Sequence, residues 1–180
     1  MSTRKYVTYS LFVAITCLLQ LLSTYINFIG LPITLSLIPV IIGGALYGVQ
    51  FGSILGLSFG IIVALMVVFG IDPTGAIMFS MHPFITVSIC LLKGMFAGMF
   101  GALIYKKINN KKVAIIIDAL ITTLSNTILF VVVLFLFFDA KFSTITSILL
   151  SVNFLIEIII NTILAPSLLP IINKRRHKTI

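Results

Sequence analysis

Six long runs of apolar residues restrict the fold of this 180-residue chain more than any other feature. Hydrophobic residues make up 60% of the chain and charged residues only 9%. A domain of this size exposes much of its surface, so a soluble protein could not bury so many apolar side chains. Runs of about 20 apolar residues are long enough to cross a bilayer. The sequence therefore predicts an all-α, polytopic membrane protein and excludes soluble enzymes, nucleic-acid-binding proteins and disordered chains.

The hydropathy along the chain predicts a bundle of six transmembrane helices in a single domain covering residues 1–180. The predicted helices cover residues 6–28, 33–47, 51–69, 84–105, 113–138 and 146–172. The second of these is short and contains Pro39. Between the third and the fourth, residues 71–75 are typical of a turn, and a semi-polar stretch follows as far as Pro83.

Basic residues are concentrated in three places: before the first helix, between the fourth and fifth helices, and after the sixth. They are Arg4, Lys5, Lys106, Lys107, Lys111, Lys112, Lys174, Arg175, Arg176 and Lys178. In contrast, Lys141 is the single basic residue in a loop on the opposite side, and Lys93 lies inside a span. Because cytoplasmic loops are enriched in lysine and arginine, we expect both termini in the cytoplasm and the segment 70–83 outside.

Small residues recur every four positions on two predicted helices. They are Gly48, Gly52, Gly56 and Gly60 around the third helix, and Gly94, Gly98 and Ala102 on the fourth. This spacing lets helix backbones approach closely in a membrane, and we interpret both stripes as internal packing faces. Ser10 and Ala14 repeat the spacing on the first helix. Either internal packing or docking of a second membrane subunit would explain that pair.

Lys93, Asp118 and Glu157 are ionisable residues inside predicted spans, where burying a charge costs at least about 2.5–3.5 kcal/mol. With a rise of about 1.5 Å per residue, Lys93, Asn126 and Glu157 come out at similar heights in the outer half of the bilayer. Asp118 lies nearer the cytoplasmic edge. We expect it to extend toward the cytoplasmic surface or to pair with a loop lysine.

Two interpretations are open for the outer polar residues. Lys93 and Glu157 form a buried ion pair with each other, or Lys93 binds the carboxylate of a solute while Asn126 and Glu157 hydrogen-bond its polar remainder. Three further polar residues would close such a cavity from outside: Asn153, Ser80 and His82. The sequence has no metal-ligand cluster, catalytic motif or ATP-binding loop. We therefore expect no metal, no cofactor and no enzymatic activity.

The chain resembles the substrate-specific (S) components of energy-coupling factor (ECF) transporters, which are the vitamin-capture subunits of bacterial uptake systems. The resemblance covers residues 5–174 and is most specific in residues 35–48, LSLIPVIIGGALYG, and 52–60, GSILGLSFG. Within the family, the pattern looks most like that of pantothenate-type members. The shared motifs are Ser-Asn-Thr at 125–127, Phe-Phe at 137–138, Asn153 with Glu157, and a basic residue at Lys93.

This resemblance implies a function and a set of partners. The chain would bind a vitamin, with pantothenate as the first candidate and another vitamin such as riboflavin as the alternative. Its first helix, at Ser10 and Ala14, would dock on a transmembrane coupling subunit that is joined to two ATPase subunits. The residues alone also allow a different function, that of a self-standing carrier coupled to protons or sodium ions. In such a carrier Lys93, Asp118 and Glu157 would form a relay for the coupling ion.

Overall fold

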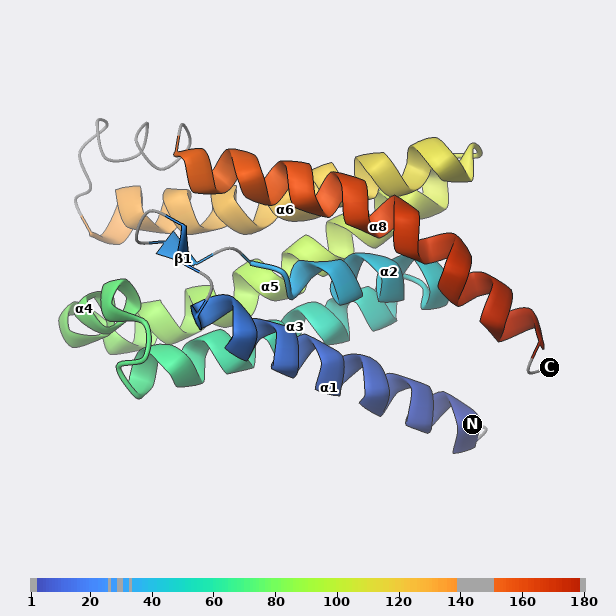
Figure 1. Cartoon of the computed structure of the whole chain (residues 1–180). Helices are drawn as coiled ribbons and strands as arrows, with labels where there is room; N and C mark the ends of the chain where they lie inside the picture. Colours follow the sequence, from blue (N-terminus) through green and yellow to red (C-terminus); the bar gives the residue numbers. More distant parts are fainter. Residues whose placement is uncertain (1–2, 26, 29–30, 33, 139–150, 179–180) are drawn as a thin grey trace.

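The computed structural model describes residues 3–25, 27–28, 31–32, 34–138 and 151–178 of the chain (Figure 1). Within these residues there are seven helices and one small antiparallel hairpin. The elements are α1 (Thr3–Tyr25), β1 (Asn27–Phe28), β2 (Leu31–Pro32), α2 (Leu37–Tyr47), α3 (Val49–Val68), α4 (Pro73–Met81), α5 (Pro83–Lys107), α6 (Lys111–Phe137) and α8 (Val152–Lys178). The predicted helical, polytopic class is confirmed.

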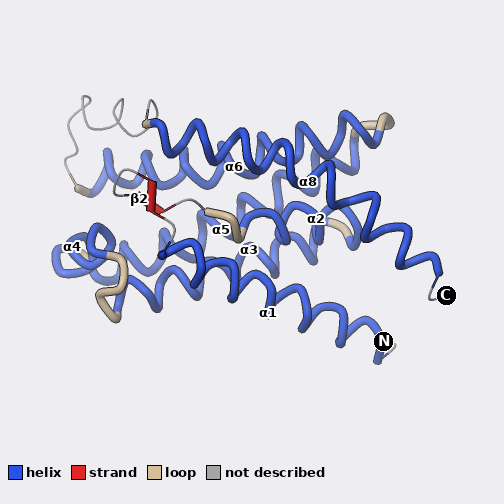
Figure 2. Tube along the Cα trace, in the orientation of Figure 1, coloured by secondary structure: helices blue, strands red, loops and turns tan. Residues whose placement is uncertain are grey.

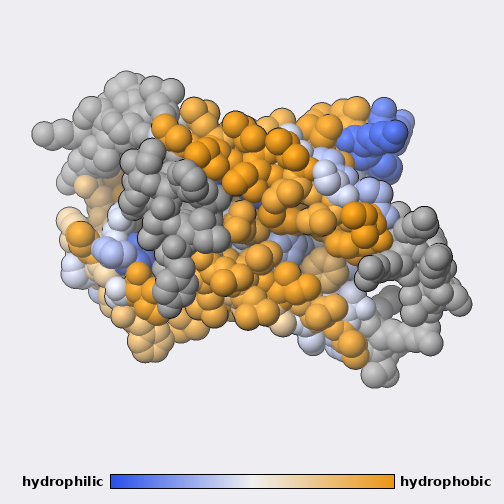
Figure 3. All heavy atoms as spheres, in the orientation of Figure 1, coloured by the Kyte–Doolittle hydropathy of each residue, from blue (hydrophilic) through white to orange (hydrophobic). Residues whose placement is uncertain are grey.

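Five of these helices are long and apolar enough to cross a membrane, by length and composition: α1, α3, α5, α6 and α8. Figure 1 shows them running along a common direction, and Figure 3 shows a predominantly hydrophobic middle between more hydrophilic ends. The predicted second span is shorter than expected, since α2 has 11 residues. A helix of that size is about 16 Å long, roughly half the thickness of the hydrocarbon core.

Helix α2 occupies the centre of the bundle, where it contacts α1, α3, α5, α6 and α8. The first eight of its eleven residues are buried. Pro39 is tolerated because it lies in the first helical turn, where a backbone N–H has no partner within the helix. The helix ends at Gly48, whose φ of 92° is favourable only for glycine, and α3 begins at the next residue.

Helices α3 and α5 pack through the predicted stripes at Gly52, Gly56 and Gly60 and at Gly94 and Gly98, which confirms internal packing at these positions. Gly48 was predicted to belong to the same stripe, but a Cβ atom added there would meet nothing within 4 Å. A Cβ atom added to Gly52 would lie only 2.6 Å from the carbonyl oxygen of Gly98. One added to Gly60 would lie 2.9 Å from the Cα atom of Leu91. The two helices therefore contact each other through backbone atoms. Such close backbone contact is expected in a membrane, where no hydrophobic driving force brings helices together.

The segment that follows α3 forms a helix, whereas its sequence is typical of a turn and a semi-polar stretch. The Asp72 carboxylate accepts hydrogen bonds from the backbone N–H groups of Thr74 at 3.1 Å and Gly75 at 3.2 Å. Pro73 occupies the first helical position, where proline is favoured. Asp72 and Pro73 therefore begin α4 instead of marking only a turn.

The two termini lie at the same end of the bundle, together with the connection between α5 and α6 (Figures 1 and 2). The four lysines that flank this connection are exposed: Lys106, Lys107, Lys111 and Lys112. Helix α4 lies at the opposite end (Figure 1). The basic residues of the chain ends and of this connection are thus separated from the α4 region by the length of the apolar helices.

Candidate functional site

Three elements meet at the carboxylate of Glu157. This residue lies on α8 and is 8% exposed. Its carboxylate hydrogen-bonds with the side chain of Thr34, just before α2, and interacts electrostatically with Lys93 on α5. The Oε1 atom of Glu157 is buried and has no hydrogen-bond partner. The carboxylate therefore has an acceptor atom available for a further group.

The Lys93 ammonium group lies over an aromatic ring instead of directly against a carboxylate. Its Nζ atom is 5.0 Å from the centroid of the Phe130 ring on α6, and the side chain is half-buried. Such a contact stabilises a cation without using its hydrogen-bond donors. Both Lys93 and Glu157 are described, and no ion pair joins them, so their charges interact at longer range.

Two asparagines add buried oxygen atoms on the contacting helices α6 and α8. Asn126 is 7% exposed, and its Oδ1 atom has no hydrogen-bond partner. Asn161 is 1% exposed; its Nδ2 atom donates to the Oγ1 atom of Thr123 at 3.0 Å, and its Oδ1 atom has no partner. A buried polar atom without a partner costs about 1–3 kcal/mol. This group of acceptors is therefore suited to a ligand that brings hydrogen-bond donors.

Asn161, Thr123 and Thr34 belong to this site, although the sequence analysis did not select them. Asn161 follows Glu157 by four residues, which places both on the same face of a helix. Thr123 precedes Asn126 by three residues on α6. The helical spacing from Glu157 and Asn126 could therefore have identified Asn161 and Thr123. Thr34 lies far from Glu157 in the sequence, and only the tertiary fold brings these two residues together.

The predicted environment of Asp118 is wrong. This carboxylate is fully buried, and its Oδ1 atom accepts a hydrogen bond from the Thr122 hydroxyl at 3.0 Å. It packs against Gly101 of α5, where the absence of a side chain leaves room for it. Asp118 therefore neither extends to the surface nor pairs with a loop lysine, because its helix face points toward α5.

Three residues were predicted to close the cavity from outside. The described part of the chain shows no contact between them and Lys93. Ser80 is exposed and donates to the carbonyl oxygen of Ile77 at 2.7 Å. His82, at the α4–α5 junction, is exposed, and its ring lies edge-on to Phe138 with centroids 5.3 Å apart. Asn153 lies in the first turn of α8, but its side chain falls outside the described residues. Their role stays a prediction.

Ser10 and Ala14 are both exposed on α1, so the internal-packing interpretation of their spacing is wrong. Large apolar side chains around them are exposed as well, among them Leu11 at 58% and Leu18 at 60%. This face of α1 is therefore available to lipid or to another membrane subunit.

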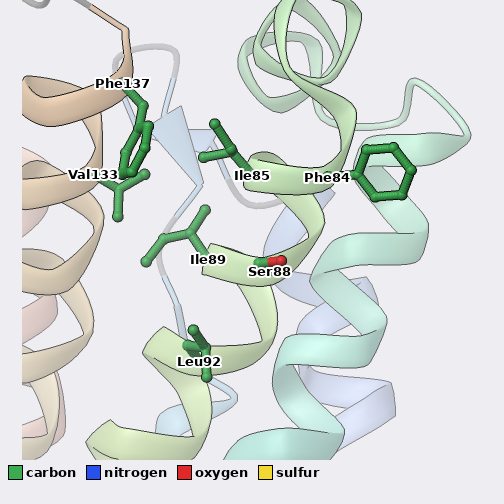
Figure 4. Close-up of a pocket in the computed structure, with 7 residues that line it drawn as sticks. All are labelled: Phe84, Ile85, Ser88, Ile89, Leu92, Val133 and Phe137. Atoms are coloured by element: carbon green, nitrogen blue, oxygen red, sulfur yellow. The ribbon is translucent and has the colours of Figure 1, made fainter.

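A separate apolar groove lies between α5 and α6. Figure 4 shows Ile85, Ile89 and Leu92 of α5 opposite Val133 and Phe137 of α6, with Ser88 as the single polar side chain of its lining. This groove contains none of the predicted site residues. It lacks the charged and amide groups that would bind a polar solute.

The groups near the Glu157 carboxylate are suited to binding a polar solute. Within the described residues, no three His, Cys, Asp or Glu side chains come close enough together to hold a metal ion. Lys93 and Thr34 interact with the Glu157 carboxylate, and the amides of Asn126 and Asn161 lie on the contacting helices α6 and α8. These groups bind polar solutes through charge and hydrogen bonds.

Comparison with known proteins gives two findings. The family of substrate-specific components of ECF transporters matches residues 4–169. The pantothenic acid transporter PanT of Lactococcus lactis subsp. cremoris (strain MG1363) is 30% identical over 185 residues, and the similarity covers 94% of each chain.

Proposed function

The chain belongs to the substrate-specific components of ECF transporters, and we propose that it captures pantothenate for uptake across the bacterial cell membrane. It is a multi-pass membrane subunit of a vitamin transporter. The similarity to a pantothenic acid transporter extends over nearly all of both chains and therefore includes every residue of the candidate site.

The chemistry of the site carries the choice of ligand. Of the five buried side-chain oxygens that lack partners among the described residues, three belong to the candidate site, on Asn126, Glu157 and Asn161, and Lys93 supplies the positive charge. Pantothenate combines one carboxylate with an amide N–H and hydroxyl groups. Its carboxylate matches a single lysine, and its donors match the free oxygens. The solute would offset the cost of burying these groups.

Each residue then has a role in binding. Lys93 pairs with the vitamin carboxylate, while Asn126, Glu157 and Asn161 accept hydrogen bonds from its donors. Thr123 orients the Asn161 amide, because it holds the Nδ2 atom at 3.0 Å. The remaining three predicted residues, Asn153, Ser80 and His82, would line the external entrance.

Transport requires partners that this chain does not contain. We infer that the chain crosses the membrane six times, with α2 at the second crossing, and that both termini are cytoplasmic. The exposed apolar face of α1 around Ser10 and Ala14 would dock on the transmembrane coupling subunit. Two ATPase subunits would hydrolyse ATP on the cytoplasmic side.

The proposal is tested with the full chain purified in detergent. Mass spectrometry identifies the ligand that co-purifies, and calorimetric titration measures pantothenate affinity. Removing a charged or buried hydrogen-bonding partner costs about 1.5–3 kcal/mol, so Glu157→Gln and Asn161→Leu should each weaken binding about 10- to 100-fold. Lys106→Met, on the exposed end of α5, is the matched control and should bind normally. Normal binding by both site variants would refute the site assignment.

A further inference from the structure

The segment formed by Thr34, Leu35 and Ser36 is tied to α1 by two side chains. The backbone N–H of Leu35 donates to the Oγ atom of Ser23 at 3.1 Å. The hydroxyl of Ser36 donates to the Oε1 atom of Gln20 at 2.6 Å. These two bonds fix the residues that directly follow Thr34, and Thr34 is the residue that hydrogen-bonds with Glu157.

The hydroxyl of Ser36 is used in an unusual way. Ser36 is the residue that precedes α2, a position where serine normally accepts a hydrogen bond from the first helical turn. Here its side chain makes no such cap and bonds with Gln20 instead. A contact between distant parts of the chain has replaced a local helix cap, and departures of this kind are typical of functional positions.

The α1 residues that hold the segment are themselves well fixed. Ser23 is fully buried, and its hydroxyl donates to the carbonyl oxygen of Leu19 at 2.7 Å. The Nε2 atom of Gln20 lies 3.9 Å from the sulfur of Met66 on α3, which directs the Oε1 atom toward Ser36. Ser36 is also fully buried. Polar groups buried in this way stabilise one arrangement of the segment.

We propose that Gln20 and Ser23 act as positioning residues of the solute site. Through Leu35 and Ser36 they hold Thr34 against one side of the Glu157 carboxylate, so that the other oxygen stays directed at the solute. This inference rests on the proposed function, because it gives Glu157 a role in binding. It adds residues of α1 that do not touch the solute but determine its affinity.

The test measures pantothenate affinity of full-length variants by calorimetry. Ser36→Ala and Ser23→Ala each remove one anchor of the segment and should weaken binding about tenfold, whereas Ser36→Thr keeps the hydroxyl and should restore it. Thr16→Val is the matched control. It removes a fully buried hydroxyl of α1 whose one hydrogen bond within the described part of the chain is to the carbonyl oxygen of Phe12 in the same helix, at 2.8 Å, and it should bind normally.

A double-mutant cycle separates positioning from general stability. If Ser36 acts by holding Thr34, the Thr34→Val, Ser36→Ala double variant should bind no more weakly than Thr34→Val alone. Fold-changes that multiply, or normal binding by both Ser36→Ala and Ser23→Ala, would overturn the inference while leaving the proposed function intact. A wild-type protein that does not bind pantothenate would overturn both.

Discussion

Replacing Gly52 by alanine tests whether backbone contact between α3 and α5 holds the bundle together. The new Cβ atom would lie 2.6 Å from the carbonyl oxygen of Gly98 and 3.2 Å from both the Cβ atom of Ala102 and the Cα atom of Gly44. Ordinary contact begins at 3.4 Å, so the two helices would have to separate by about 0.8 Å at this point. None of the three atoms can move by a side-chain rotation.

Overpacking of this kind costs about 1–3 kcal/mol, whereas alanine gains up to about 1 kcal/mol over glycine in helix propensity. Because the nearest atom is a backbone carbonyl oxygen that cannot rotate away, the cost should lie in the upper part of this range, about 2–3 kcal/mol. We therefore expect Gly52→Ala to lower the free energy of unfolding by about 1–2 kcal/mol, measured by denaturant titration in mixed micelles. Gly43→Ala is the matched control. Its nearest neighbour is the terminal Cδ1 atom of Leu55, which can rotate, so the loss should be smaller. An unchanged stability of Gly52→Ala, or a larger loss in Gly43→Ala, would refute the reasoning.

Two further predictions concern orientation and the buried carboxylate of α6. In a cysteine-free background, a membrane-impermeant thiol reagent applied to intact cells should label Thr74→Cys in α4 but not Lys112→Cys beside the α5–α6 connection; the reverse result would contradict the proposed orientation. Asp118→Asn should lose less stability than Asp118→Leu, because an amide oxygen can still accept from Thr122, whereas the leucine variant should lose about 1–3 kcal/mol in the same denaturant titration. Equal losses would mean that the negative charge itself is required.

Hydropathy predicted the long helices well because each must be apolar over most of its length to lie in lipid. The glycine stripes were also interpreted correctly except at Gly48, since four-residue spacing identifies a helix face without knowledge of its partner. Helix α4 was missed because the pair Asp72 and Pro73 is compatible with a turn and with a helix start. A helix begins here because the backbone N–H groups of Thr74 and Gly75 donate to the Asp72 carboxylate.

Side-chain environments were harder to predict, because distance along a helix gives depth in the membrane but not direction. Asp118 was expected near the loop lysines, yet it faces α5 at Gly101. Lys93 was placed at the level of Glu157, but the sequence did not predict the Phe130 ring beneath its amine. Thr34 reaches Glu157 because α2 lies at the centre of the bundle, which hydropathy could not show.

The most direct test of the account compares pantothenate with its alcohol analogue, in which a CH2OH group replaces the carboxylate. Wild-type protein in detergent should bind pantothenate at least about tenfold more tightly, since the Lys93 ammonium recognises the charge. Lys93→Met should bind the two compounds with similar affinity. A Lys93→Met variant that still prefers pantothenate as strongly as the wild type would show that the carboxylate is recognised elsewhere and would contradict the proposed site.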